Sequence, residues 1–399
     1  MRPGTRIGRR ALLAGAAALP LAAWLPRPAW ALPATSTPMV RVRLGAPRPR
    51  AVLRLSPGSW EVRSEAGQAY TLVQPGALEA VLAPGEAGLR LGERDTGATR
   101  LRIACREPFA LDGTSYAGDL LVSIEGTQLL LVNELDLETY VAGVIPNECA
   151  CHAPPATHRA QAVASRTYAY VLLAAPGAER APFHLKDTQA SQVYRGLAVA
   201  PAFGATAADM RQRTAETRGV LVTWQNRPLT TYFASTCGGH TTDPATSNLK
   251  ADAEAAPLGG VRCGFCSTSS RFRWTKRIAD EDLVAGMAAR NLPIALPLAG
   301  IEVTQRGRGG WARQLVITAG PQRTARTVSG PDFRAAAGLN SHNILAIRRV
   351  AGAFEIDGGG WGHGVGMCQW GALEMGRRGL GEADILRLYY PGATLARLY

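Results

Sequence analysis

The sequence predicts an α+β protein, with a β-rich N-terminal region followed by a mixed α/β region. Three observations indicate this class. Apolar and polar residues alternate in short runs between residues 39 and about 131. Apolar residues next recur at helical spacing between residues 160 and 174, after Pro154-Pro155. Beyond about residue 219, short strand-like runs mix with glycine-rich loops, and a last helix is expected near residues 383–388.

Residues 1–31 have the pattern of an export signal. The pair Arg9-Arg10 precedes an apolar stretch, Ala11–Leu25, which is shorter than the about 20 residues that span a bilayer. Ala29-Trp30-Ala31 is a small-x-small cleavage site. We expect a twin-arginine-type signal cleaved after Ala31, with an ordinary secretory signal or a short anchor as the alternatives. The mature protein is then exported, either periplasmic or associated with the cell wall.

Composition narrows the classes of function. The formal charge of +13 includes five Arg in the signal, which leaves +8 on the mature chain. These basic residues are scattered rather than clustered, so no nucleic-acid partner is expected. The sequence contains no P-loop, HExxH or GxSxG motif, which speaks against nucleotide use and against typical hydrolase sites. No later run approaches 18 apolar residues, so no transmembrane span is expected in the mature protein.

The β-rich region is punctuated by Gly and Pro about every ten residues, as in small β-domains. Within this pattern, Leu120–Ile124 and Leu129–Val132 flank Glu125-Gly126-Thr127, which predicts a hairpin.

Glu148 stands just ahead of the helix that follows Pro154-Pro155. A carboxyl group among apolar groups can have a raised pKa and serve as a general acid. The alternative is an ordinary solvated loop residue or a charge at the helix start. The helix also carries a polar face, which by itself would be expected to meet solvent; its members are His158, Gln161, Ser165 and Arg166.

Two pairs of ligand residues follow. Cys237-x2-His240 precedes Cys263-x2-Cys266, and each pair offers two ligands from one tight turn. Zinc prefers four N or S ligands in a tetrahedral arrangement, so the spacing predicts a Zn²⁺ site of the Cys3His type, most simply a closed structural one. Disulfides are the alternative outside the cytoplasm. Twin-arginine export favours zinc, because it carries proteins that fold, and take up metal, before export.

Glycine falls at every second position from Gly360 to Gly366. In an extended segment this places one set of side chains on one face and leaves bare backbone on the other, where a strand or a polymer can approach closely. That set is Trp361, His363, Val365 and Met367. Trp361 would offer a sugar a stacking surface and His363 a titratable group. The alternative is a glycine-rich turn that packs its Trp into the core. A further stretch, residues 183–196, is rich in amide, hydroxyl and aromatic groups suited to sugars.

The chain resembles the SpoIID/LytB (stage II sporulation protein D-like) family in seven segments that occur in the family's order: ETYVAGVIPNE, AQAVASRTYA, DTQASQVYRG, STCGGHT, RCGFCSTSSRFRW, GWGHGVGMCQWGA and LYYPGATL. The resemblance covers about residues 118–399. It implies a SpoIID-like catalytic region of mixed α/β structure (118–399), which follows the predicted signal (1–31) and the β-rich N-terminal region (32–117).

The resemblance implies action on bacterial peptidoglycan. The sporulation member is a lytic transglycosylase that cleaves glycan strands already stripped of stem peptides, whereas the LytB-type member enhances a cell-wall amidase. Both remain hypotheses for this chain, and a non-catalytic wall-binding module is a third. Glu148 matches the catalytic glutamate and would be the general acid and base. Asp187 and Asp357 are spare carboxylates, so hydrolysis is not excluded.

The resemblance also suggests supporting roles. Trp361, His363 and Gln369 are expected to line the substrate cleft, and the residues expected to support it are Arg166, Gln192 and Tyr194. Zinc-binding members use a Cys and a His near the STxGGxT motif, a neighbourhood that Cys237 and His240 match. Cys263 and Cys266 are assigned as ligands from their spacing alone.

Two cysteines depart from the family pattern, since Cys149 stands where Met is common and Cys368 where Ser is common. Three thiolates on zinc would leave four of the seven cysteines: Cys105, Cys149, Cys151 and Cys368. We expect Cys149 or Cys151 to form a disulfide with Cys368 or Cys105 and to brace the active-site loop.

Overall fold

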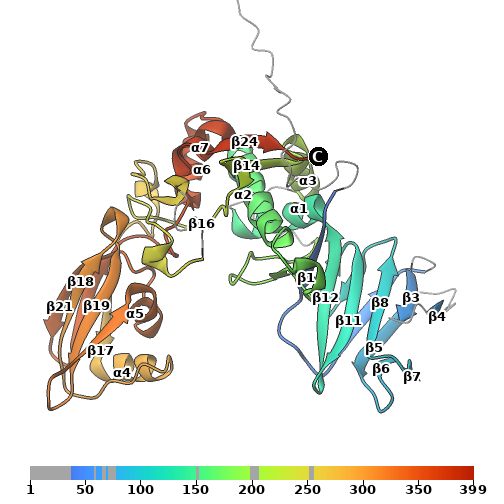
Figure 1. Ribbon diagram of the computed structural model, residues 1–399, viewed down its shortest axis with the longest axis horizontal. Coiled ribbons are helices and arrows are strands. Elements are labelled where there is room, and N and C mark those ends of the chain that lie inside the picture. Colours follow the sequence, from blue (N-terminus) through green and yellow to red (C-terminus); the bar gives the residue numbers. More distant parts are fainter. Residues whose placement is uncertain are drawn as a thin grey trace, which may run out of the picture.

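The computed structural model describes residues 37–57, 60–64, 69–70, 78–149, 152–197, 206–250 and 256–399. They form an arch, in which a β-rich arm in blue and cyan and a second arm in orange flank a helical middle (Figure 1). The predicted α+β class is confirmed. The predicted signal lies outside the described residues. None of the described helices combines the length and the apolar character that crossing a bilayer requires.

Two sheets that share one core make up the first arm. One has the order β13-β1-β12-β11-β8-β3-β4 and the other β10-β9-β2-β5-β6-β7. Alternation places Val40, Val42, Leu53 and Leu55 in the core. The strands are β1 (Met39–Arg43), β2 (Ala51–Leu55), β3 (Trp60–Ser64), β4 (Ala69–Tyr70), β5 (Leu78–Pro84), β6 (Leu89–Leu91), β7 (Arg94–Asp95), β8 (Arg100–Cys105), β9 (Phe109–Leu111), β10 (Thr114–Tyr116), β11 (Asp119–Glu125), β12 (Gln128–Asp136) and β13 (Leu185–Lys186).

The predicted hairpin is confirmed as β11 and β12. Glu125 pairs with Gln128, so Gly126 and Thr127 make the turn, and Gly126 has the positive φ of 62° that such a turn requires. Both strands pair within the first arm's larger sheet, which therefore extends past the boundary expected at residue 117.

The helical middle joins the two arms. Its long helix, α2, confirms the helix predicted after Pro154, and α7 confirms the last helix. The Asp136 side chain accepts hydrogen bonds from the first turn of α1 and fixes its start. The elements are α1 (Leu137–Glu148), α2 (Pro155–Leu173), α3 (Ala207–Glu216), β14 (Val220–Trp224), β15 (Arg227–Pro228), β16 (Phe233–Ala234), β23 (Met367–Cys368), α6 (Gln369–Arg377), α7 (Glu382–Tyr389) and β24 (Thr394–Arg397), with 3-10 turns at Ala178–Arg180, Ala245–Ser247, Ala256–Leu258 and Cys266–Thr268.

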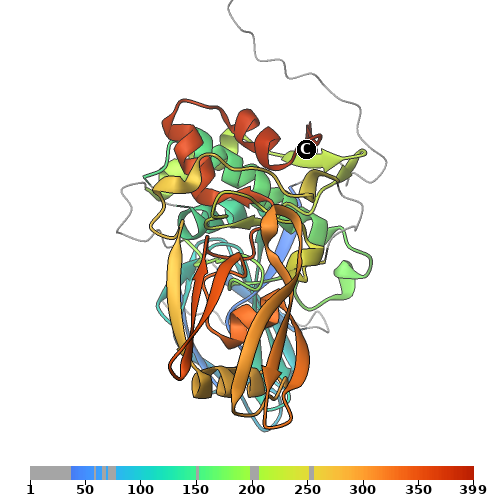
Figure 2. The same ribbon diagram turned by 90° about the vertical axis from the view of Figure 1, so that its left-hand side faces the viewer.

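The second arm has two three-stranded sheets, β17-β22-β21 and β18-β19-β20, which face the viewer in Figure 2. It has its own apolar core, which includes Leu315, Phe333 and Ile356. Its elements are β17 (Trp274–Ala279), α4 (Asp280–Ala288), β18 (Leu298–Arg306), a 3-10 turn at Arg308–Gly310, β19 (Ala312–Ala319), β20 (Thr324–Ser329), α5 (Gly330–Ala336), β21 (Ile344–Val350) and β22 (Ala353–Gly358).

A buried ion pair fastens the helical middle together. The Arg166 guanidinium on α2 is fully buried and donates to both carboxylate oxygens of Glu138 on α1, at 2.9 and 2.6 Å. Tyr399 Oη donates to the same carboxylate at 2.6 Å, and the backbone N–H of Gly219 at 3.0 Å. The charges therefore hold α1, α2 and the last residues of the chain in one arrangement.

Breaking this pair should cost far more stability than breaking an exposed one. Glu138→Ala leaves a buried guanidinium without its counter-ion, so we expect the free energy of unfolding to fall by about 3–5 kcal/mol in urea denaturation. Glu216→Ala, which removes a partly exposed partner of Arg159, is the control and should cost about 1 kcal/mol or less. Equal losses in the two variants would contradict the assignment.

Candidate active site

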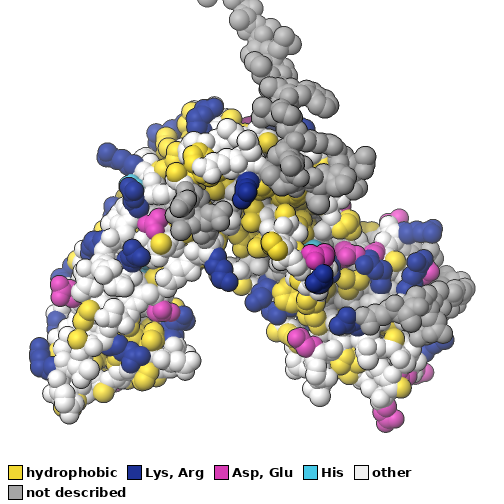
Figure 3. All heavy atoms as spheres, in the orientation of Figure 1, with side chains coloured by type: hydrophobic (Ala, Val, Ile, Leu, Met, Phe, Trp, Pro, Cys, Tyr) yellow, Lys and Arg dark blue, Asp and Glu magenta, His cyan; other side chains and the backbone are white. Residues whose placement is uncertain are grey.

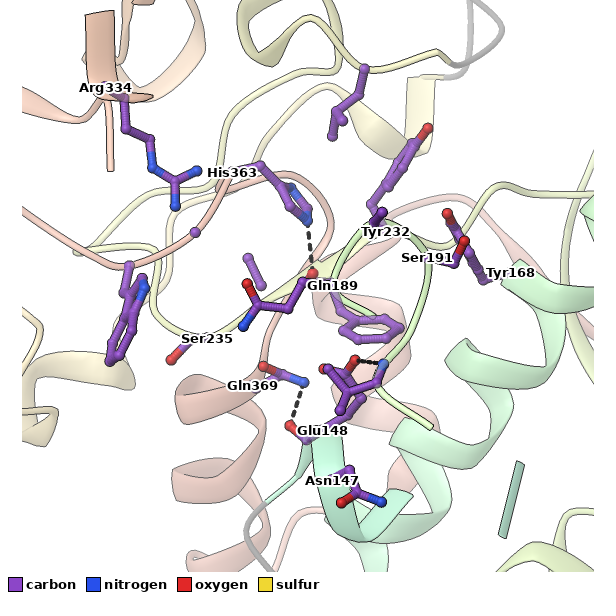
Figure 4. Close-up of a pocket in the computed structure, with 17 residues that line it drawn as sticks. Asn147, Glu148, Tyr168, Gln189, Ser191, Tyr232, Ser235, Arg334, His363 and Gln369 are labelled. Carbon is purple, nitrogen blue, oxygen red and sulfur yellow. Dashed lines mark hydrogen bonds between the residues drawn. The ribbon is translucent and has the colours of Figure 1, made fainter. Parts of the chain in front are cut away.

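A cleft of about 430 Å³ opens where the helical middle meets the second arm (Figure 4). Glu148 lines it as the last residue of α1, rather than as the loop residue expected from the sequence. Three segments far apart in the chain meet at this residue. The backbone N–H of Val193 donates to Glu148 Oε1 at 2.6 Å, and Gln369 Nε2, at the start of α6, donates to the Glu148 backbone carbonyl at 2.6 Å.

The surroundings of Glu148 favour its protonated form. Burial raises the pKa of the carboxyl above its ordinary value, while the hydrogen bond from Val193 and the Gln369 amide oppose the rise. The C-terminal end of α1 carries partial negative charge, which also disfavours a carboxylate. A carboxyl with a raised pKa in a cleft is suited to proton donation.

The glycine-rich segment forms one wall of the cleft, but it is not the extended strand expected from the sequence. Gly360, Gly362, Gly364 and Gly366 all have positive φ, between 70° and 109°, so the chain turns repeatedly. A Cβ at Gly366 would lie 2.0 Å from the backbone oxygen of Tyr232. The expected close approach of another segment is therefore present, and the backbone leading into β16 makes it.

His363 lines the cleft as a fixed neutral group. Its Nε2 lies 2.8 Å from the Phe233 carbonyl and its Nδ1 accepts from the Val365 N–H at 3.1 Å. Both ring nitrogens are thus engaged, and burial lowers the pKa of His363 to about 4. The ring holds the glycine-rich wall against β16 and stays uncharged near neutral pH.

Trp361 and Gln369 also line the cleft, as predicted. The Trp361 side chain is 42% exposed, and the guanidinium of Arg271 lies 4.3 Å from its ring centroid. The guanidinium lies over the ring in a cation–π contact, and the aromatic surface that stays exposed is one on which a sugar can stack.

Three residues predicted to support the cleft do not reach it. Arg166 pairs with Glu138, the Gln192 amide bonds the Tyr140 hydroxyl and the Ser165 carbonyl, and the Tyr194 hydroxyl donates to Asn133. All three are at most 1% exposed. This corrects the expectation that they bind substrate, because each is hydrogen-bonded to other groups in the interior.

Other lining residues were not singled out from the sequence. The stretch at residues 183–196 contributes Gln189 and Ser191, so its polar composition was a usable signal. Tyr168 and Tyr232 lie along one side, and Arg334 of α5 lies at the far end from Glu148 in Figure 4. No sequence motif pointed to Arg334.

Four buried cysteines form a candidate metal centre beside the cleft. The Sγ atoms of Cys237, Cys263, Cys266 and Cys368 all lie within 4.8 Å of one another, and those of Cys237 and Cys266 are 3.6 Å apart. The expectation for His240 is therefore wrong. Its Nδ1 lies 2.6 Å from the Thr241 carbonyl, and Cys368 takes the fourth place instead.

The predicted disulfide is also wrong. It required Cys368 or Cys105, and both are free thiols. Cys368 is drawn into the cluster because β23 pairs with β16, which leads directly to Cys237. Cys151 lies outside the described residues.

Comparison with known proteins finds similarity to one family. The family model described as stage II sporulation protein matches residues 125–224. An uncharacterized protein of Brachyspira hyodysenteriae is 32% identical over 312 residues, 77% of this chain and 79% of that protein. Stage II sporulation protein D of Bacillus subtilis is 28% identical, over 71% of this chain and 81% of its own length. The amidase enhancer of Bacillus subtilis is 24% identical, over 63% of this chain and 40% of its own length.

The raised pKa of Glu148 makes a prediction about stability. An acid whose pKa is higher in the folded protein destabilises it progressively as the pH rises above the unfolded-state pKa, and the full effect is reached above the folded-state pKa. It has no such effect where it is protonated in both states. Glu148→Gln, which can still accept from Val193, should therefore raise the free energy of unfolding at pH 7 relative to the unaltered protein. At about pH 4 the two should be closer, as urea denaturation can measure. A gain that is the same at both pH values would contradict a raised pKa.

Proposed function

The chain belongs to the SpoIID/LytB family, and from this premise we propose that it cleaves peptidoglycan glycan strands by a lytic transglycosylase-type reaction, on strands stripped of stem peptides. One observation carries the proposal. Among the described residues that line the cleft, Glu148 is the sole carboxyl group, and its surroundings favour the protonated form.

Glu148 would act first as acid and then as base. It gives its proton to the glycosidic oxygen between N-acetylmuramic acid and N-acetylglucosamine, and the bond to the anomeric carbon breaks. The 6-hydroxyl of the muramic acid attacks the resulting oxocarbenium-like centre and closes a 1,6-anhydro ring. The Glu148 carboxylate takes up the hydroxyl proton and is ready for the next turnover.

A single carboxyl suits this reaction better than hydrolysis with inversion, which needs a second carboxylate to activate water. The two spare candidates do not line the cleft. Asp187 Oδ2 accepts from the backbone N–H of Gly45 in the first arm. Asp357 lies on β22, where Arg348 and Thr275 bind it.

The cysteine cluster fits Zn²⁺. A Zn–S bond of about 2.3 Å in a tetrahedron places sulfurs about 3.8 Å apart, close to the 3.6 Å between Cys237 and Cys266. Four buried thiols also cannot all ionise without a cation. We propose that the four cysteines would hold a closed structural zinc, which when bound supplies rigidity rather than reaction chemistry. Cys368 directly precedes Gln369, so a fixed Cys368 keeps the Gln369 amide on the Glu148 carbonyl.

The setting proposed for this reaction is the periplasm or the cell wall, reached through the export signal predicted at residues 1–31. Lys and Arg side chains are scattered on both sides of the hollow between the arms (Figure 3). The charge of +8 predicted for the mature chain suits a wall polymer that carries carboxylates and phosphates.

A second function has support in the similarity to an amidase enhancer. In that case the cleft would bind glycan, or serve as a wall-binding module, without turnover. A protein that enhances an amidase would raise the activity of a co-incubated cell-wall amidase and would not need the Glu148 carboxyl.

Digestion of purified, peptide-free glycan strands tests the reaction. We expect 1,6-anhydro ends in mass spectra, and Glu148→Gln should lower the rate by about 10²-fold or more, because it cannot donate the proton. Asp357→Asn, which removes a partly exposed carboxylate outside the cleft, is the matched control and should keep full activity.

Two results would count against the proposal. Fragments with reducing ends and no anhydro ring would indicate hydrolysis. No cleavage, combined with stimulation of an amidase that persists in Glu148→Gln, would support the enhancer instead.

Metal analysis tests the zinc site. We expect about one zinc per chain, lost in Cys237→Ser and in Cys368→Ser together with a lower melting temperature. His240→Ala and Cys105→Ser should keep the metal. If His240→Ala loses the zinc and Cys368→Ser retains it, the Cys3His ligand set expected from the sequence is correct instead.

A further inference from the structure

The charges that line the cleft are few and lie at opposite ends. Among its described lining residues, Glu148 is the sole acid and Arg334 the sole arginine or lysine, while His363 is held neutral. The raised pKa of Glu148 disfavours its negative charge, and the guanidinium of Arg334 is the one arginine or lysine cation of the described lining. A cleft of this kind attracts an anionic ligand.

Arg334 has little to satisfy its charge within the described part of the protein. Its one hydrogen bond there runs from Nε to the Leu339 carbonyl at a long 3.4 Å, and no described carboxylate pairs with it. Nearby arginines of the same arm differ: Arg348 and Arg349 both hold carboxylates. Burial lowers the pKa of Arg334, yet a guanidinium stays charged at any physiological pH. An anion that enters the cleft would form charge-assisted hydrogen bonds with this partly desolvated guanidinium and supply its missing counter-ion.

The position of Arg334 restricts which anion can reach it. In Figure 4 its guanidinium points into the cleft beside His363, and Glu148 lies at the other end. Trp361 also lines the cleft and offers a sugar an aromatic surface, and the guanidinium of Arg271, which is not a lining residue, lies over its ring. A ligand that contacts both residues therefore presents to Glu148 the bond whose oxygen is protonated, and to Arg334 a negatively charged group.

We infer that Arg334 is a specificity-determining residue that binds the free lactyl carboxylate of a muramic acid unit in the glycan strand. The inference rests on the proposed function and deepens it. A stem peptide is attached through this carboxyl, so an intact peptide converts the anion to a neutral amide and adds bulk. Removal of the peptide restores the charge that Arg334 pairs with. The preference for stripped strands would then arise from this one ion pair.

The test compares two forms of one substrate. Peptide-free glycan strands are prepared with free lactyl carboxylates, and a second portion is converted to the methylamide by carbodiimide coupling with methylamine. The unaltered protein should cleave the free acid with kcat/KM at least about tenfold higher than the amide, with most of the difference in KM. Arg334→Gln should lose this preference and treat both forms alike, and Arg334→Lys should retain part of it.

Arg313→Gln is the matched control, because Arg313 is exposed on β19 of the same arm and does not line the cleft. It should keep the full preference. Circular dichroism and melting temperature of each variant show whether it folds. The comparison of the two substrates uses the unaltered protein, so it tests the inference even if a variant does not fold.

Binding separates this inference from the proposed reaction. Glu148→Gln protein should bind the free acid more tightly than the methylamide, and more weakly as salt is added, even if the chain never cleaves glycan. Equal binding and equal cleavage of the two forms would overturn the role of Arg334 while leaving the reaction intact. A preference that persists in Arg334→Gln would overturn it as well.

Discussion

The hydrogen bond from Gln369 Nε2 to the backbone carbonyl of Glu148 is the link on which the site depends. It joins residues 221 positions apart and ties the end of α1 to the start of α6. On one side of this link is the carboxyl that faces the cleft. On the other is Cys368, a member of the four-cysteine cluster and the N-cap of α6, where its Sγ accepts from the Gly371 N–H. Anything that moves the cluster therefore moves the surroundings of Glu148.

The glycine-rich wall shows why this link can form. The backbone passes so close to its neighbours that side chains do not fit: a Cβ at Gly366 would lie 2.0 Å from the backbone oxygen of Tyr232, just before β16, and one at Gly364 would lie 2.3 Å from the Trp311 ring of the second arm. The positive φ values let the chain turn at each of these glycines. That path delivers Met367 and Cys368 to a parallel pairing with Phe233 and Ala234, and so brings Cys368 to Cys237.

Local pattern predicted much of the fold and part of the site. The hairpin, α2 and α7 follow from periodicity and turn residues that act over a few positions. Motif content also pointed to Glu148, Trp361, His363 and Gln369, which the structure brings to one cleft.

The predictions that were wrong concern contacts between residues far apart in the chain. Spacing favoured His240 over Cys368 as the fourth zinc ligand, because no local pattern in the sequence indicates that β16 pairs with β23. Arg166 belongs to a polar helix face, and its partner Glu138 could be recognised only once α1 and α2 packed together. Arg334 stands alone on a short helix with no motif around it.

The separation of the two charges in the cleft is itself a constraint. Burial raises the pKa of Glu148, and the hydrogen bonds from Val193 and Gln369 lower it. A guanidinium next to the carboxyl would have stabilised the carboxylate and lowered the pKa, which would remove the proton that an acid must hold before reaction. Placing the cation on α5 of the second arm, away from α1, lets one cleft combine a carboxyl of raised pKa with a charge that attracts an anion. A polymer whose reactive bond and negative group lie apart matches that arrangement, whereas a small anion would meet Arg334 without reaching Glu148.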